Sequence, residues 1–214
     1  MRITVIGAGN VGGTLGRRWA ELGHDVTFGL RKPEQGAAGV KGGGALPARA
    51  RVASIAEAIT GAEVVLLATP WDVTPDALRS LGALEGVILI DATNPLGPGL
   101  ALQHGPHGES GGEQVQAMVP QARVVKAFAT TGYNNMADPI YDGAATAMFY
   151  AGDDTEAKRT VAELVRILGF DAIDAGPLRR SRELEHMASL WIALAVGIGV
   201  PAMGREMAFR VVRR

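Results

Sequence analysis

Short apolar runs alternate with amphipathic stretches along most of the chain. The runs are rich in Val and Ile and lie at Ile3–Ile6, Val26–Phe28, Val64–Ala68, Val87–Ile90, Val124–Phe128, Ala147–Tyr150 and Ala172–Ile173. The stretches Leu15–Leu22, Pro75–Leu81, Gly112–Val119 and Glu156–Leu168 repeat apolar residues at helical spacing. Continuous apolar strands separated by helices are typical of a parallel sheet covered on both faces. The sequence therefore predicts an α/β, doubly wound fold with a mainly parallel sheet whose last two strands return near the C-terminus.

The composition sets limits on size and on partners. A chain of 214 residues, 47% hydrophobic, is long enough for one domain (1–214) with a substantial core. A net charge of −1 gives no electrostatic reason to expect nucleic acid or an anionic membrane as a partner. Without cysteine, the chain has no disulfide and no thiol nucleophile. Because the first strand starts at Met1 and the apolar run 187–200 is too short to span a bilayer, we expect a cytoplasmic protein.

Two apolar C-terminal segments, 178–198 and 202–212, are predicted to be helices. They carry more apolar surface than one small domain can cover, so we expect them to pack on the domain and on a second subunit in a homodimer.

The first strand runs directly into a glycine-rich turn, GAGNVG at 7–12, which has the spacing G-x-G-x-x-G. Gly7 permits a tight turn, Gly9 leaves room for a pyrophosphate, and Gly12 lets the helix pack closely on the strand. The free N–H groups at the helix start then bind the anion. In this strand–turn–helix context, the spacing predicts a dinucleotide site.

The residues after the second strand indicate which dinucleotide is bound. Many dinucleotide-binding proteins place Asp or Glu here to bind the adenosine ribose, but this chain has Leu30, Arg31 and Lys32. Guanidinium and ammonium groups pair with phosphate oxygens. We therefore expect NADP(H) rather than NAD(H).

Polar residues follow two other strands, where ligands of such sheets bind. Thr69, Pro70 and Trp71 end one strand, and Trp71 is expected either to border the nicotinamide or to pack at a helix start. Asp91 precedes Asn94 and Pro95, and a structural role in binding loop N–H groups is favoured for it over a catalytic one. The long loops 32–48 and 94–110 are expected to be a mobile surface loop and a functional loop, respectively.

Ionisable groups suited to catalysis are scarce. Lys126 lies within an apolar run, so we expect a packed stem with its ammonium reaching a carboxylate. His104 and His107 have no third metal ligand nearby, and His24 and His186 are expected at the surface or an interface, so no metal is predicted. Oxidation of an alcohol needs a positioned acid or base, whereas hydride transfer between two redox cofactors needs mainly stacked rings. The sequence favours transfer between cofactors, and no catalytic residue is assigned.

These residues resemble a known family, the coenzyme F-420-dependent NADP oxidoreductases, over nearly the whole chain. The similarity includes GAGNVGGTLGRRWAELGHDVTFGLRKPE (7–34), TPWD (69–72) and AGDDTEAKRTVAELVRILGFDAIDAGPLRRSRELEHM (151–187). It implies a Rossmann domain without a separate catalytic domain, with NADP bound by Ala8–Val11, Arg31 and Thr69. DATNP (91–95) and VVKAF (124–128) also resemble the NADPH-binding domain of the six-transmembrane metalloreductases.

The chain departs from the family at three positions. Leu30 replaces a usual Ser, Gln35 stands near a usual Lys, and Ala129 replaces the usual His or Asn. The expected function is hydride transfer between NADPH and a deazaflavin (coenzyme F-420) or flavin co-substrate. The alternatives are reduction of a small carbonyl or imine, and a non-catalytic NADP(H)-sensing module. The residues expected to contact the cofactors are Gly7, Ala8, Gly9, Asn10, Val11, Gly12, Leu30, Arg31, Lys32, Thr69, Pro70, Trp71, Asn94, Pro95, Ala129 and Thr130.

Overall fold

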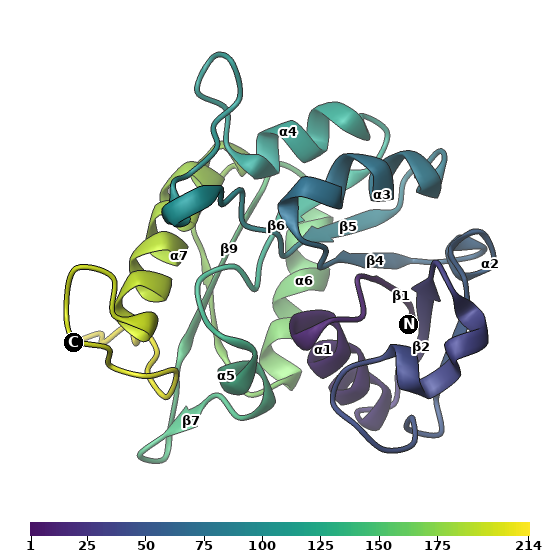
Figure 1. Ribbon diagram of the computed structural model, residues 1–214, viewed down its shortest axis with the longest axis horizontal. Coiled ribbons are helices and arrows are strands. Elements are labelled where there is room, and N and C mark those ends of the chain that lie inside the picture. Colours follow the sequence, from purple (N-terminus) through teal and green to yellow (C-terminus); the bar gives the residue numbers. More distant parts are fainter.

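A sheet of eight strands forms the middle layer of the molecule, with helices on both faces (Figure 1). The computed structural model describes residues 1–214. The strands are β1 Arg2–Ile6, β2 Asp25–Leu30, β3 Ala50–Ser54, β4 Val64–Leu67, β5 Ile88–Asp91, β6 Arg123–Lys126, β9 Ala147–Gly152 and β10 Asp171–Asp174, with a separate hairpin of β7 Ile140–Tyr141 and β8 Ala144–Ala145. The helices are α1 Asn10–Glu21, α2 Ile55–Ile59, α3 Thr74–Leu81, α4 Gly111–Met118, α5 Tyr133–Ala137, α6 Thr155–Ile167 and α7 Ser181–Val196.

The order of strands in the sheet is β10-β9-β6-β5-β4-β1-β2-β3. All neighbours pair in parallel except β6 and β9, which are antiparallel. This arrangement confirms the predicted Rossmann-like α/β fold with a mainly parallel sheet. It also brings the carboxyl ends of β1, β2, β4, β5 and β6 to one edge.

Two clusters of buried side chains hold the layers together, one on each face of the sheet. The first joins Val5 of β1 to Leu15 and Trp19 of α1 and to Leu164 of α6. The second joins strand residues such as Leu67 to the apolar faces of α3 and α4. Because alternate residues of a strand point to opposite faces, successive side chains of β1 contribute to both clusters. The sheet is therefore covered on both sides, as its apolar strands require.

The region 32–54 is more structured than the sequence indicates. Pro33–Gly39 forms 3₁₀ turns, and Ala50–Ser54 is the edge strand β3, which apolar content alone does not predict. The backbone N–H of Lys41 donates to Ala8 O (3.0 Å), so this loop lies against the glycine-rich turn.

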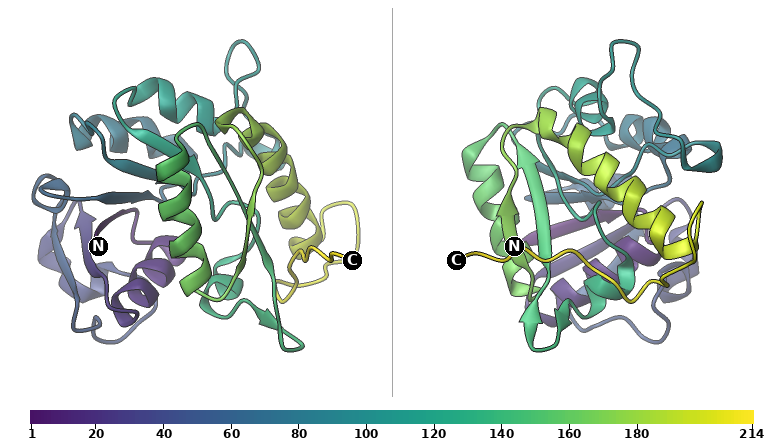
Figure 2. Two further views of the ribbon diagram at one scale, coloured as in Figure 1. Left: turned by 180° about the vertical axis from the view of Figure 1, so that it is seen from behind. Right: turned by 90° about the vertical axis from the view of Figure 1, so that its left-hand side faces the viewer.

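The predicted helix at 202–212 is wrong. α7 ends at Val196, with Gly197 in the left-handed conformation, and residues 201–214 contain no helix (Figure 2). The main-chain oxygens of this tail accept bonds from elsewhere in the molecule: Phe209 O from Ala147 N (2.8 Å), and Met207 O from both Asn135 Nδ2 (2.6 Å) and Trp191 Nε1 (3.0 Å). These tertiary bonds outweigh the local helix propensity of the segment.

None of the helices has the combination of length and apolar composition needed to cross a bilayer.

Candidate functional site

A cleft of about 790 Å³ opens at the carboxyl ends of β1, β2 and β4. Eight of the sequence-predicted residues line it: Gly7, Ala8, Gly9, Leu30, Arg31, Lys32, Thr69 and Pro70. The remaining wall includes Ile55 of α2 and Ala77 of α3, which sequence reasoning did not assign. A crevice beside the first glycine-rich turn is where open α/β sheets bind nucleotides.

The three glycines of the turn differ in what surrounds them. A Cβ on Gly7, whose φ is +94°, would collide with the backbone of Ala68, and one on Gly12 would collide with Gly7 O. A Cβ on Gly9 would meet nothing within 4 Å. Gly7 and Gly12 therefore permit the close approach of α1 to the strands, while Gly9 leaves open space in front of the helix.

The start of α1 has free hydrogen-bond donors. Gly9 is its N-cap and supplies no side-chain acceptor, and no acidic residue lies in the first turn. The first N–H groups of a helix have no partner within the helix, and they carry the positive end of its dipole. The exposed turn at Gly9 and Asn10 is thus suited to an anion.

Three cations line the cleft: Arg31, Lys32 and Lys41. Lys41 was missed because it lies in a low-complexity stretch, although it is the one cation between Lys32 and Arg49. Its backbone is held against α1, since Arg17 Nε donates to Lys41 O (3.1 Å) and Arg17 Nη1 donates to Ala45 O (2.8 Å). The cleft therefore has a positively charged end that a phosphate would neutralise.

The other predicted residues lie outside this cleft. Asn10, Val11 and Gly12 belong to the first turn of α1. Trp71 begins a 3₁₀ turn and packs against the apolar cluster beneath α3, which favours the packing role over a wall of the site.

The last four predicted residues sit at the ends of β5 and β6. Asn94 Nδ2 donates to Ala129 O (3.1 Å), so the two strand ends are tied together there, with Pro95 and Thr130 next in sequence. Asn94 Oδ1 and Thr130 Oγ1 are buried and have no hydrogen-bond partner. Buried polar atoms are rarely left unsatisfied in proteins, so these two oxygens are candidate acceptors for a ligand.

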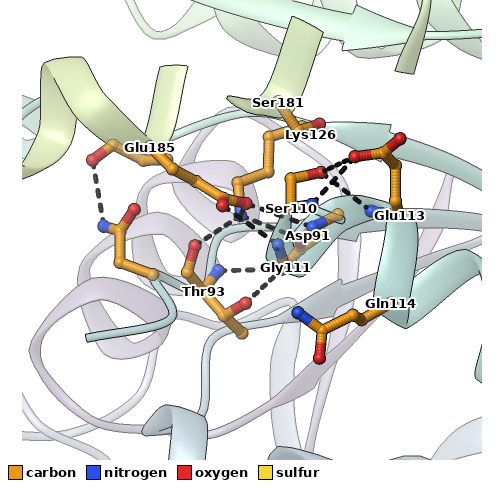
Figure 3. Close-up of polar contacts among 12 residues, drawn as sticks. Asp91, Thr93, Ser110, Gly111, Glu113, Gln114, Lys126, Ser181 and Glu185 are labelled. Atoms are coloured by element: carbon orange, nitrogen blue, oxygen red, sulfur yellow. Dashed lines mark hydrogen bonds and ion pairs between the residues drawn. The ribbon is translucent and has the colours of Figure 1, made fainter. Parts of the chain in front are cut away.

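A fully buried ion cluster lies beside these strand ends (Figure 3). Lys126 Nζ is 2.9 Å from Asp91 Oδ2, 3.0 Å from Glu185 Oε1 and 2.6 Å from Thr93 O. All three charged side chains have 0% exposure. Asp91 Oδ1 accepts from the N–H and the hydroxyl of Thr93, which confirms that it binds a loop N–H group. The expectation that the Lys126 ammonium reaches a carboxylate is also confirmed.

Glu185 is the member of the cluster that sequence reasoning missed. Its two oxygens accept from Gly111 N (3.0 Å) and Gly112 N (3.1 Å) at the start of α4. The available signal was a carboxylate beside Leu184 and Ala188 on the buried face of α7. Burial lowers the pKa of Lys126, but the two carboxylates outweigh this effect and raise it above its ordinary value.

A second contact joins α4 to α7 at the surface. Arg182 Nε and Nη2 each donate to a Glu113 oxygen at 2.8 Å. Hydrogen bonds from Arg182, followed by those from Ser110, lower the pKa of Glu113 to about 2. Nearby, His104 and His186 stack with ring centroids 5.6 Å apart. No three His, Asp or Glu side chains are grouped closely enough to hold a metal ion.

The chain is similar to proteins of one redox family. A family model described as NADP oxidoreductase, coenzyme F420-dependent, matches residues 2–95. A solved structure from Arthrobacter sp. FB24, provisionally assigned as an F420-dependent NADP reductase, is 33% identical, with full coverage of both chains and a TM-score of 0.85.

Two further relatives share part of their length with this chain. The rat metalloreductase STEAP3 is 30% identical over 184 residues, which is 86% of this chain and 36% of the rat protein. A reductive aminase from Aspergillus terreus, solved with NADPH, is 17% identical, with a TM-score of 0.65 and coverage of 92% of this chain and 62% of the aminase. At that identity, the aminase shows the shared fold alone. Because the Arthrobacter protein matches along its entire length, the chain belongs to the family of coenzyme F420-dependent NADP oxidoreductases.

Proposed function

We propose that this protein binds NADPH in the cleft of β1, β2 and β4 and catalyses hydride transfer to a deazaflavin (coenzyme F-420) or flavin acceptor. The observation that carries the proposal is the cleft itself, in which an open helix start at Gly9 adjoins three cations. An acid at the end of β2 would repel a 2′-phosphate, whereas Arg31 and Lys32 attract it.

The residues present fit this cofactor. The N–H groups at the start of α1 bind the pyrophosphate, and the charged end of the cleft binds the 2′-phosphate. The orphaned oxygens of Asn94 and Thr130 would accept hydrogen bonds from the carboxamide of the nicotinamide. Bound NADPH would supply the hydride. The protein's part is then to hold the reacting ring at the ends of β5 and β6, with Pro95 and Ala129 excluding water.

The choice of a ring acceptor follows from the ionisable groups. The titratable residues lining the cleft are Arg31, Lys32, Lys41 and Asp76, and all but Asp76 are cations. Asp91 and Lys126, which end β5 and β6, neutralise each other in the buried cluster. Neither of these two groups is therefore free to move a proton, and transfer between two stacked rings needs no proton donor.

The proposal includes a single domain, 1–214, that pairs with a second copy and resides in the cytoplasm. The support for pairing is the apolar surface of α7 and of the residues after it. Leu190, Val196, Ile198, Val200 and Met203 are between 45% and 63% exposed. Burial of these side chains against a second copy would remove them from water.

The test is NADPH oxidation measured in parallel with coenzyme F-420, FMN, FAD and a small panel of ketones and imines. We expect turnover with at least one of the ring acceptors and none with the panel. Turnover with the panel alone would refute the proposed acceptor. NADPH binding without turnover of any compound would identify a sensing module instead.

A further inference from the structure

The loop 94–110 leaves the sheet at the end of β5 and returns at the start of α4. Within it, the structure has one 3₁₀ turn, Pro98–Leu100, and a single bridge between Leu96 and Leu102. Backbone bonds such as Gln103 N to Pro95 O (2.7 Å) and Gly105 N to Glu109 O (2.8 Å) order the loop internally, but they do not fix it to the sheet. Its position relative to the sheet depends on the contacts that join it to the rest of the molecule, including those at its two ends. Both ends lie at the buried ion cluster (Figure 3).

The first end is fixed by Asp91 and Lys126. The Asp91 carboxylate accepts from the backbone and hydroxyl of Thr93, and Lys126 Nζ donates to Thr93 O at 2.6 Å. Each polar group of Thr93 is therefore satisfied, and Asn94 follows directly.

The second end is fixed by Glu185. Its carboxylate accepts from the N–H groups of Gly111 and Gly112, which directly follow the loop. A Cβ on Gly111 would come within 3.1 Å of Glu185 Oε1, so the backbone of α4 packs directly on this carboxylate.

One ion pair joins the two ends. Lys126 Nζ lies 3.0 Å from Glu185 Oε1, and Asp91 already neutralises the ammonium. The cluster thus has one carboxyl group more than it has cations, and the N–H groups at the start of α4 donate to the second of them, Glu185. Displacement of either end would leave a buried charge unpaired, so the cluster favours one geometry of the loop.

We propose that Lys126 and Glu185 are positioning residues, which hold both ends of the loop 94–110 and thereby fix Asn94 against Ala129 on the acceptor side of the site. The link to the site is the hydrogen bond from Asn94 Nδ2 to Ala129 O (3.1 Å). Apolar side chains would fill the same space with comparable stability, but they would not fix the positions of N–H and C=O groups. The assignment to the acceptor side rests on the proposed function.

The experiment compares Glu185→Gln with Glu183→Gln. Glu183 lies on the exposed face of the same helix and pairs with Arg180 alone, so it is the matched control. Glu185→Gln should speed amide exchange in residues 93–112 by about tenfold or more and reduce the turnover number by about tenfold or more, because small displacements at a reacting centre are costly. NADPH affinity should fall by less than turnover does, because Glu185 positions Asn94 and none of the residues of the cleft that are proposed to bind the pyrophosphate and the 2′-phosphate.

Glu185→Asp keeps the carboxylate but shortens the side chain, so it distinguishes the effect of geometry from the effect of charge. It also provides a test if Glu185→Gln does not fold. It keeps the buried charge but is one methylene too short to bridge Lys126 and Gly111, so exchange of 93–112 should still rise. If amide exchange in residues 93–112 were unchanged in both variants, Glu185 would not hold the ends of the loop. If exchange were faster but turnover unchanged, the loop would be held without positioning the acceptor side, which would overturn the positioning role. Amide exchange is measured without any acceptor. If the wild-type protein oxidised no NADPH, the proposed function would be refuted, but the exchange data would still test whether Glu185 holds the loop 94–110.

Discussion

Glu185 Oε1 of α7 lies 3.0 Å from Lys126 Nζ of β6, and neither side chain is exposed to solvent. The contact joins the C-terminal helix to the middle of the sheet, beside the strand ends where we place the acceptor. The contribution of this contact to the stability of the fold can be measured separately from cofactor binding and turnover.

Lys126→Met should destabilise the fold by about 3–5 kcal/mol, because it leaves the carboxylates of Asp91 and Glu185 buried without their cation. Urea unfolding measures this loss. Arg79→Met is the control, because its pair with Asp76 is exposed and should contribute at most about 1 kcal/mol. Equal losses for the two variants would contradict the buried cluster.

Acid should weaken the contact between α4 and α7. The pKa of Glu113 is about 2 in the folded protein, below its ordinary value of 4.5. Its stabilisation is therefore complete above pH 4.5 and is lost as the pH falls towards 2. The pair is partly exposed, so the contribution is about 1 kcal/mol. Glu113→Gln should flatten the stability profile in this window. Glu156→Gln, which removes an exposed pair with Arg159, is the matched control.

Cofactor choice should depend on the cations of the cleft. Arg31→Ala should weaken NADPH binding by about tenfold or more, or 1.4 kcal/mol, and leave NADH nearly unchanged. Lys41→Ala should weaken NADPH binding as well, and a parallel loss for NADH would place its ammonium at the pyrophosphate. Arg49→Ala is the control, because it pairs with Asp25 at the opposite end of β2. Titration of both cofactors at one salt concentration decides the matter.

Turnover should depend on the size of the side chain at position 129 rather than on a histidine that could donate a proton. Ala129→Leu should abolish turnover while NADPH affinity stays nearly intact, because the added side chain occupies the place of the second ring. His104→Gln and His107→Gln should cost far less than the factor of about 10²–10⁴ that acid–base catalysis contributes. A thousandfold loss in a folded histidine variant would indicate reduction of a carbonyl instead.

The protein should form a homodimer through the surface of α7. Light scattering at micromolar concentration should give twice the chain mass of 22.3 kDa. Leu190→Glu should shift the mass towards the monomer, because the added charge would be buried at the interface. A wild-type mass of 22.3 kDa would contradict this assembly.

The strands and helices with strong periodicity could be predicted from the sequence. The sequence predicts the unit of β1, the glycine-rich turn and α1, because local sterics and helix geometry specify it. The sequence does not predict the edge strand β3, because its segment ARVAS is short, is half exposed and lacks a continuous apolar run. The tail 202–212 has helix-forming residues, but its partners Asn135 and Ala147 lie far earlier in the chain.

Some residues of the candidate site could be predicted from the sequence, and others could not. Arg31 and Lys32 follow a strand directly, so their position could be predicted. Lys41 reaches the cleft through a loop that Arg17 holds in place, and Glu185 reaches the cluster from a helix at the other end of the chain. Such contacts depend on the tertiary fold, which local patterns do not specify.

Direct hydride transfer from NADPH to a ring acceptor can be followed with an isotope. The experiment is a single turnover of coenzyme F-420 with NADPH that carries deuterium at both C4 positions of the nicotinamide. Transfer should be slower than with unlabelled NADPH, and deuterium should be found bound to carbon in the reduced deazaflavin. Reduced deazaflavin without deuterium, or deuterium found in a small ketone or imine product while every ring acceptor stays oxidised, would contradict it.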